Sequence, residues 1–146
     1  IVLDGRSKNS SRLSTNNIFM VNSYGNNLVA VKGDGSVGIG TVNTKGYKLA
    51  VNGGVIVTKL TVKSFGNWPD FVFEKNYELP SLTEVERFVK EHRHLPGMPT
   101  AAEVAEKGVD VGEVNQKLLQ KVEELTLYII EQQKMIRELQ EMMKKN

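Results

Sequence analysis

The last third of the chain carries a heptad repeat, and this pattern constrains the fold more than any other feature. Apolar residues recur at alternating spacings of three and four from residue 111 to residue 143. With Val122 at heptad position a, the a and d positions are Val111, Asn115, Leu118, Val122, Leu125, Ile129, Gln132, Ile136, Leu139 and Met143. We call these ten residues the seam. A repeat held over about five heptads predicts a coiled-coil helix.

A competing interpretation is one amphipathic helix that packs its apolar stripe on its own domain. Aromatic residues make up only 7% of the chain, so such a domain would offer little surface to cover a long stripe. The polar seam residues Asn115 and Gln132 fit a coiled coil, in which buried polar positions fix register and oligomer state. We therefore expect these two residues to set the register between chains.

The heptads alone leave both two and three chains open. Isoleucine at position a with leucine at position d favours a coiled coil of two chains. The positions beside the seam favour more than two, because they widen the apolar stripe. These flanking residues are Val114, Met135 and Met142 at g and Leu119 at e.

Glycine and proline divide the chain into three zones. Ten of the thirteen glycines precede residue 67, and all four prolines lie between residues 69 and 99. This distribution predicts a mixed β and α fold. We expect a glycine-rich β region over 1–66, a connector with a local aromatic core and two short helices over 67–109, and the coiled-coil helix over 110–146.

The β region alternates in the manner of short strands. Residues 28–32 form an apolar run that ends at the turn signal Gly33-Asp34-Gly35, and Val37 and Ile39 follow with alternating glycines. A later strand is expected over 55–63, with Ile56, Thr58, Leu60 and Val62 on one face.

Strands this short bury little area within one chain, and open edges pair with other chains. We therefore expect copies of the chain to stabilise this region. The alternative is an ordinary β-sandwich whose upstream half is missing. The chain begins at Ile1 rather than at a methionine, so we expect it to be a piece of a longer protein.

Three capping boxes mark the expected starts of three helices. Ser81 with Glu84, Thr100 with Glu103, and Asp110 with Glu113 have the required spacing. The first helix must end before Pro96, and the second is expected to end at Gly108. The residues before these helices form the expected local core, with a strand over 71–73. They are Trp68, Phe71, Val72, Phe73 and Tyr77.

Composition excludes several function classes. The chain has no cysteine, so it has no disulfide, thiol nucleophile or cysteine-zinc site. A net charge of +2 without a basic face gives no reason to expect nucleic acid as a partner. No apolar run approaches the ~20 residues that a spanning helix needs, so membrane insertion is not expected.

The candidate chemical sites are weak. His92 and His94 would share a metal ion only on a strand, whereas they fall at the end of a helix, where the macrodipole favours cations. Asp70 and Glu74 resemble a carboxylate pair, but nothing makes them converge. Residues 33–40 lack the lysine and the following helix of a phosphate loop. We expect no catalytic residue, no metal site and no cofactor, and hence no enzyme.

The order of several short motifs resembles the C-terminal region of phage tail-fibre-like proteins of Bacteroidetes and their phages. Residues 35–41 read GSVGIGT and residues 48–53 read KLAVNG. They are followed by WPDFVF at 68–73, by HLPGMP at 94–99, and by the heptads from 118 onward. YELPSL at 77–82 also matches. The resemblance covers roughly residues 33–140.

This resemblance implies an elongated homotrimer with an intertwined β-stalk, a short helical connector and a C-terminal parallel coiled coil. It implies a structural role in assembly and host attachment, in a tail fibre on a virion or a fibre-like appendage. A bacterial cell-surface adhesin or glycan-binding module is the alternative, with Tyr24, Tyr47 and Trp68 as candidate sugar-stacking rings. Expected partners are further copies of the chain, other tail or baseplate proteins, and a host receptor or glycan.

Overall fold

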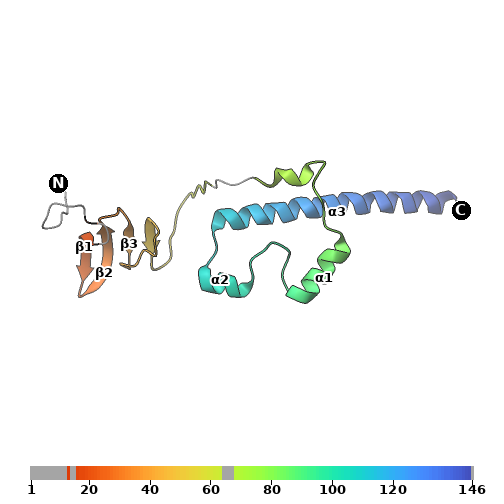
Figure 1. Cartoon of the computed structure of the whole chain (residues 1–146). Coiled ribbons are helices and arrows are strands. Elements are labelled where there is room, and N and C mark those ends of the chain that lie inside the picture. The colour runs from red at the N-terminus through yellow and green to blue at the C-terminus, as the bar shows by residue number, and fades with distance from the viewer. Residues whose placement is uncertain (1–12, 14–15, 64–67, 146) are drawn as a thin grey trace. The chain divides into compact units, whose positions relative to one another are not determined.

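The structure is a computed structural model that describes residue 13, residues 16–63 and residues 68–145. The chain forms two compact units, residues 1–60 and residues 61–146. Within the described residues the first unit holds a four-stranded sheet, and the second holds three α-helices and a 3-10 helix (Figure 1). The prediction of a mixed β and α fold is confirmed. A trimeric stalk and a coiled coil concern several chains and stay predictions.

The sheet has the order β1-β2-β3-β4. Strands β1 (Asn17–Ser23) and β2 (Asn26–Lys32) form an antiparallel hairpin. Their two-residue turn places Tyr24 and Gly25 at positive φ, as a type I′ hairpin turn requires. Strand β3 (Val37–Ile39) pairs antiparallel with β2, and β4 (Leu49–Val51) pairs parallel with β3.

The predicted turn between β2 and β3 is present. The Asp34 carboxylate accepts hydrogen bonds from the Ser36 hydroxyl at 2.6 Å and from the Ser36 amide at 2.8 Å. These two hydrogen bonds hold the pKa of Asp34 below its usual value, and the bond from the Ser36 hydroxyl has the larger effect. Gly35 has a φ of 81°, a conformation that L side chains rarely adopt. The turn is therefore fixed by local chemistry.

Strands β3 and β4 bring the GSVGIGT and KLAVNG segments together. The Asn52 amide donates to the Ile39 carbonyl at 2.9 Å, and its side-chain nitrogen donates to the Gly40 carbonyl at 3.3 Å. A Cβ atom at Gly38 would lie 2.0 Å from the Thr41 carbonyl oxygen. The glycine in the middle of β3 is thus required by a close approach of the backbone.

The expected strand over 55–63 is wrong for the single chain. Residues 54–57 and 59–63 have no regular secondary structure, and Ile56 is 99% exposed. A strand needs a neighbour to receive its backbone hydrogen bonds, and a lone extended segment is not stable in water. The alternating pattern is present in the sequence, but no strand among the described residues pairs with this segment.

The sheet unit buries few side chains. Of its described residues only Ala30, Ser36, Thr44 and Gly38 are buried. Large apolar side chains stay exposed on all four strands, among them Phe19, Met20, Leu28, Ile39 and Leu49. A sheet that leaves this much apolar area in water gains little from burial. The small interior agrees with the expectation that copies of the chain stabilise this region, without testing it.

The second unit contains η1 (Pro69–Phe73), α1 (Leu82–His92), α2 (Ala101–Lys107) and α3 (Val111–Lys145). The strand expected over 71–73 is wrong, because these residues form the 3-10 helix η1. Proline at its first position has a preset φ that favours a helical start. The predicted boundary between residues 66 and 67 lies outside the described residues.

The local core was predicted in part. Val72 is 1% exposed, and the rings of Phe71 and Tyr77 lie 5.8 Å apart. Trp68 and Phe73 are exposed, so their assignment to the core was wrong. A 3-10 helix repeats every three residues, and η1 turns Pro69 and Val72 inward together. In a β-strand, whose side chains alternate between two faces, a different set of these residues would be exposed.

The capping boxes at Ser81 and Thr100 are confirmed. The Glu84 amide donates to Ser81 Oγ at 3.3 Å, and the Ser81 amide donates to the Glu84 carboxylate at 2.9 Å. Thr100 and Glu103 repeat the arrangement at 3.2 and 2.8 Å. Hydrogen bonds from the capping residues hold the pKa values of both glutamates below normal.

The remaining helix ends also follow local signals. The Glu113 amide donates to Asp110 at 2.9 Å, which caps α3, while the Glu113 carboxylate pairs with Lys117 instead of completing the box. Helix α1 ends at Arg93 in the left-handed conformation, and α2 ends at Gly108 as predicted.

Candidate functional site

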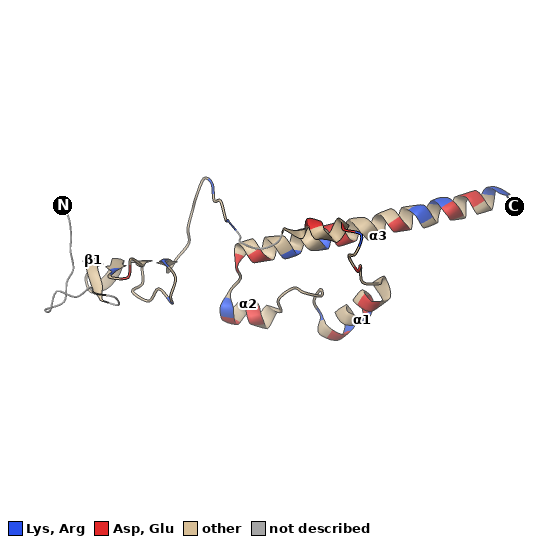
Figure 2. Ribbon diagram, turned by 45° about the horizontal axis from the view of Figure 1, so that its top comes forward, with Lys and Arg blue, Asp and Glu red and all other residues tan. Residues whose placement is uncertain are grey.

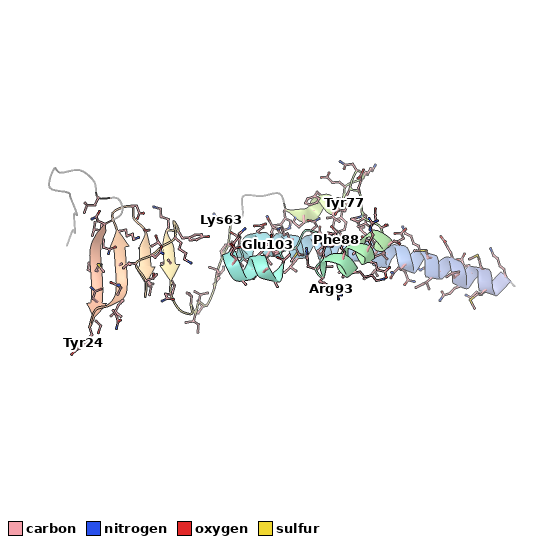
Figure 3. All side chains as sticks on the ribbon, turned by 60° about the horizontal axis from the view of Figure 1, so that its bottom comes forward. Tyr24, Lys63, Tyr77, Phe88, Arg93 and Glu103 are labelled. Carbon is pink, nitrogen blue, oxygen red and sulfur yellow. The ribbon has the colours of Figure 1, made fainter. Side chains whose placement is uncertain are left out.

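Helix α3 is covered along one face by its own chain. The 3-10 helix η1 packs against this face. The segment that leads from η1 to α1 also crosses it, with Tyr77 against α3 (Figure 3). Tyr128 is 9% exposed, and its hydroxyl donates a hydrogen bond of 2.5 Å to the Pro80 carbonyl. We call this side of α3 the covered face.

A buried glutamate lies at the centre of the covered face. Glu124 is 6% exposed and accepts hydrogen bonds from three side chains. The Tyr77 hydroxyl donates at 2.6 Å, Gln120 at 2.8 Å and the Lys121 ammonium at 2.8 Å. A carboxylate with this many charge-assisted bonds is well compensated for burial. The network joins the connector to α3.

The network determines the ionisation of its members. Burial on its own raises the pKa of Glu124, but the bonds from Lys121, Tyr77 and Gln120 outweigh burial and hold the pKa below normal. Burial, followed by the nearby Glu124 carboxylate, raises the pKa of Tyr77 and of Tyr128. Glu124 is therefore an anion that serves as an acceptor, with no feature of a proton donor.

The neighbouring Glu123 differs from Glu124. It is 7% exposed, and its Oε2 atom has no hydrogen-bond partner among the described residues. Burial raises the pKa of this carboxyl, and the charge of Asp70 on η1 adds to the shift. The covered face thus contains one glutamate stabilised as an anion and one that burial destabilises as an anion.

The seam lies on another side of α3 and is exposed at every position. The eight apolar seam residues range from 46% exposed at Leu118 to 78% at Met143. Asn115 and Gln132 are exposed as well. Figure 3 shows the side chains of the C-terminal half of α3 projecting freely from the helix. The chain therefore leaves the whole predicted seam uncovered.

Heptad positions explain why the two faces are separate. With Val122 at a, the buried residues Glu123, Glu124 and Tyr128 fall at b, c and g, away from the a and d positions. The helix does pack on its own unit, but through this other face. The alternative in which the apolar stripe itself covers the domain is therefore not what the chain adopts.

The exposed apolar stripe extends beyond the seam. Met135 and Met142 at g are exposed, and Val114 and Leu119 are half-buried. Figure 2 shows acidic and basic residues interspersed along the length of α3. Because charges of both signs are interspersed along the helix, no block of one sign on α3 would repel the α3 helix of a second copy. The apolar stripe is then the main source of attraction between two such helices.

The two histidines gather around Phe88. The ring centroids of Phe88 and His92 lie 4.3 Å apart, and those of His92 and His94 lie 6.1 Å apart. His94 Nδ1 lies 3.0 Å from the Leu95 carbonyl. Within the described residues, no group of three or more potential ligands could hold a metal ion. The rings of Phe88, His92 and His94 contact one another at the end of α1.

The turn at Asp34 and the three candidate sugar-stacking rings differ in their surroundings. Asp34 is occupied by its own turn, and Lys48 donates to the Asp34 carbonyl at 2.6 Å. Tyr24, Tyr47 and Trp68 are exposed, as sugar-stacking rings must be. Tyr24 and Tyr47 belong to the sheet unit and Trp68 to the helical unit.

The covered face was missed by sequence reasoning. Glutamates at b and c are what an ordinary coiled coil places in water, so nothing marked Glu123 or Glu124 as buried. The spacing of Glu124 and Tyr128, one helical turn apart, was the available signal. To use this spacing as a signal, one would need to know that Tyr77 and Pro80 contact α3, and the sequence does not show this.

Comparisons of the chain with protein-family models, with curated proteins and with solved structures found no match. None of the helices in the described residues combines the length and the apolar character that a bilayer-spanning segment needs.

Proposed function

We propose that this chain is a structural protein that assembles with copies of itself through the seam of α3 into a parallel homotrimeric coiled coil. The observation that carries the proposal is that each of the ten seam residues is exposed in the single chain. Large exposed apolar stripes on soluble proteins are typical of interaction sites. The role is assembly, and we propose no catalytic activity.

The size of the seam supports stable association. Helix α3 has 35 residues, which gives a rod of about 52 Å at ~1.5 Å per residue. Burying one aliphatic side chain contributes ~1.5–3 kcal/mol. The eight apolar seam residues of each chain are between 46% and 78% exposed, so burying the rest of each side chain supplies roughly half of the full value, on the order of 10 kcal/mol per chain. This is of the same order as the ~4–15 kcal/mol cost of association.

The number of chains and the setting rest on the resemblance to tail-fibre-like proteins. We propose three chains, in which the seam and connector set the register and the sheet regions then share edges along a common axis. Exposed apolar side chains on the strands and the unpaired segment 55–63 support such sharing. The proposed setting is a phage tail fibre on the virion, which attaches to a host and contacts other tail or baseplate proteins.

A second candidate is a bacterial surface adhesin or glycan-binding module with the same trimeric architecture. The exposed rings of Tyr24, Tyr47 and Trp68 favour it, because sugars stack on accessible aromatic faces. Binding of the chain to a glycan array, lost when these rings are replaced by alanine, would support this candidate over a purely structural role.

Light-scattering mass at micromolar concentration tests the proposal. We expect about three times the 16.3 kDa mass of one chain. Ile129→Asp places a charge in the seam and should give monomers, whereas Lys134→Asp at the outer f position should leave the trimer intact. A wild-type chain that is monomeric, or an Ile129→Asp variant that remains a native trimer, would overturn the assignment.

A further inference from the structure

A small apolar hollow lies directly beside the seam. Its volume is about 70 Å³, far below the ~300 Å³ at which small-molecule sites begin. It admits part of one aliphatic side chain. The residues that form most of its wall are Pro80, Val85, Leu95, Pro96, Leu125 and Tyr128. Leu125 belongs to the seam as well, so the hollow is continuous with the proposed interface.

Within the connector, helices α1 and α2, which lie on the outer side of this hollow, are loosely packed against the rest of the described chain. In the described residues, α1 and α2 bury no side chain, and none of their Cα atoms comes within 8 Å of a Cα atom of α3. In Figure 1 the chain leaves α3 after η1 and returns to the start of α3 through α1 and α2. Leu82 and Leu95 stay exposed. The connector therefore has apolar surface available for another chain.

Heptad geometry identifies the surface that a second copy would bring to the hollow. Its wall on α3 is formed by Lys121 and Tyr128 at g, Glu124 at c and Leu125 at d. These positions lie on the g side of the seam. In a parallel coiled coil the g side of one helix faces the e side of its neighbour. Position b follows e on the outer surface, so the neighbouring helix presents its e and b residues to the connector.

Among the e and b residues that the neighbouring helix would present to the connector, Ile130 is the apolar residue at the level of the hollow. It lies at b, a position that an isolated coiled coil exposes to water, and it is 46% exposed in the single chain. In register, Ile130 stands about 3 Å beyond Tyr128 along the axis at ~1.5 Å per residue. Helix side chains lean toward the N-terminus, which brings the Ile130 side chain to the level of the hollow.

We propose that the hollow is a socket for Ile130 of a second copy of this chain, so that each connector clasps the α3 helix of its neighbour. The inference rests on the proposed parallel assembly and adds to it. The seam holds the helices together, and the clasp couples α1 and α2 to the adjacent chain. The clasp explains why α1 and α2 are well-formed helices that bury no side chain within the described part of their own chain.

Cross-linking tests the clasp cleanly because the chain has no cysteine of its own. Leu95→Cys and Ile130→Cys single variants are mixed, unfolded and refolded together, then treated with a short bis-maleimide. We expect a dimer band on a denaturing gel that contains one chain of each kind. The matched control replaces Ile130→Cys with Lys134→Cys at the outer f position and should give a much weaker band.

Two further readouts separate the possible failures. If the mixture is trimeric by light scattering but yields no more cross-link than the control, the clasp is wrong and the proposed assembly stands. If the mixture is monomeric, the proposed function itself fails. A double variant that carries both cysteines and links mainly within one chain would mean that the chain's own Ile130 fills the hollow, which also overturns the clasp.

Substitution of the same residue gives an independent measurement. Ile130→Glu should lower the melting temperature of the assembly. Lys134→Glu, which makes a larger change of charge outside the socket, should not. An unchanged melting temperature for Ile130→Glu, with the trimer intact, would contradict the clasp.

Discussion

The covered face and the seam of α3 show an inverted relation between polarity and burial. The covered face buries Glu123, Glu124 and Tyr128, while the seam leaves its aliphatic residues in water. A helix that acts alone in a monomer does the opposite. The covered face holds the Glu124 carboxylate by specific hydrogen bonds from Tyr77, Gln120 and Lys121. The seam leaves its apolar side chains exposed, and under the proposed function they are available for association with other copies of the chain.

Charges in the seam should have the largest effect and should separate the two faces. In a double variant, Ile136→Asp with Leu139→Asp, the apolar burial lost is ~1.5–3 kcal/mol for each side chain, and the buried charges add to the loss. We expect assembly to fail while the hydrogen bond from Tyr128 to Pro80 persists. Sedimentation measures the mass, and near-ultraviolet circular dichroism follows the tyrosines. Loss of both signals together would show that the covered face depends on the seam.

Removing the anion of the covered face should have the next largest effect. Glu124→Ala leaves the Lys121 ammonium and the Tyr77 hydroxyl without their acceptor. Hydrogen bonds to charged groups contribute ~1.5–3 kcal/mol, so we expect a loss of about 2–3 kcal/mol in the free energy of unfolding. Urea denaturation measures it, with the exposed Glu131→Ala as the control at the same heptad position. Equal stability of the two variants would refute the structural role of the network.

A capping variant should have a smaller effect that is confined to the connector. Ser81→Ala removes the acceptor for the Glu84 amide at the start of α1, at a cost of about 1 kcal/mol. Because α1 stays away from its own α3, amide exchange should speed up in α1 first. Uniformly faster exchange along α3 would show that the two helices unfold as one.

The smallest effect should come from the pH dependence of Glu123. Its pKa is raised above the usual 4.5 by burial and by Asp70, so the folded chain holds this proton to a higher pH than the unfolded chain does. The free energy of unfolding should therefore fall as pH rises from 4.5 through the raised pKa. Glu123→Gln should remove this fall and be more stable than the wild type near neutral pH. Denaturation of both proteins across this range tests the sign.

Glu124 should shift stability in the opposite direction. Its folded pKa lies below the usual 4.5, so its contribution is present above that pH and is lost as the pH falls through the lowered value. Glu123→Gln leaves this acid-side loss in place. A variant that lost both pH effects at once would show that the two carboxyls titrate as one unit.

The sequence by itself determined the parts of this protein that depend on neighbours along the chain. The turn at Asp34, the starts of α1 and α2 at Ser81 and Thr100, and the end of α2 at Gly108 were all predicted correctly. Each is decided by hydrogen bonds or backbone preferences within a few residues. The length of α3 followed from its heptads for the same reason.

Only the tertiary structure decided which polar residues are buried and which apolar ones are not. Segment 55–63 alternates like a strand but pairs with no strand in the part of the chain that the structure describes, and residues 71–73 form a 3-10 helix against α3. Glu124 is buried because Tyr77, far away in sequence, returns to meet it. Such outcomes depend on contacts between distant segments, and a local pattern carries no information about which distant partner arrives.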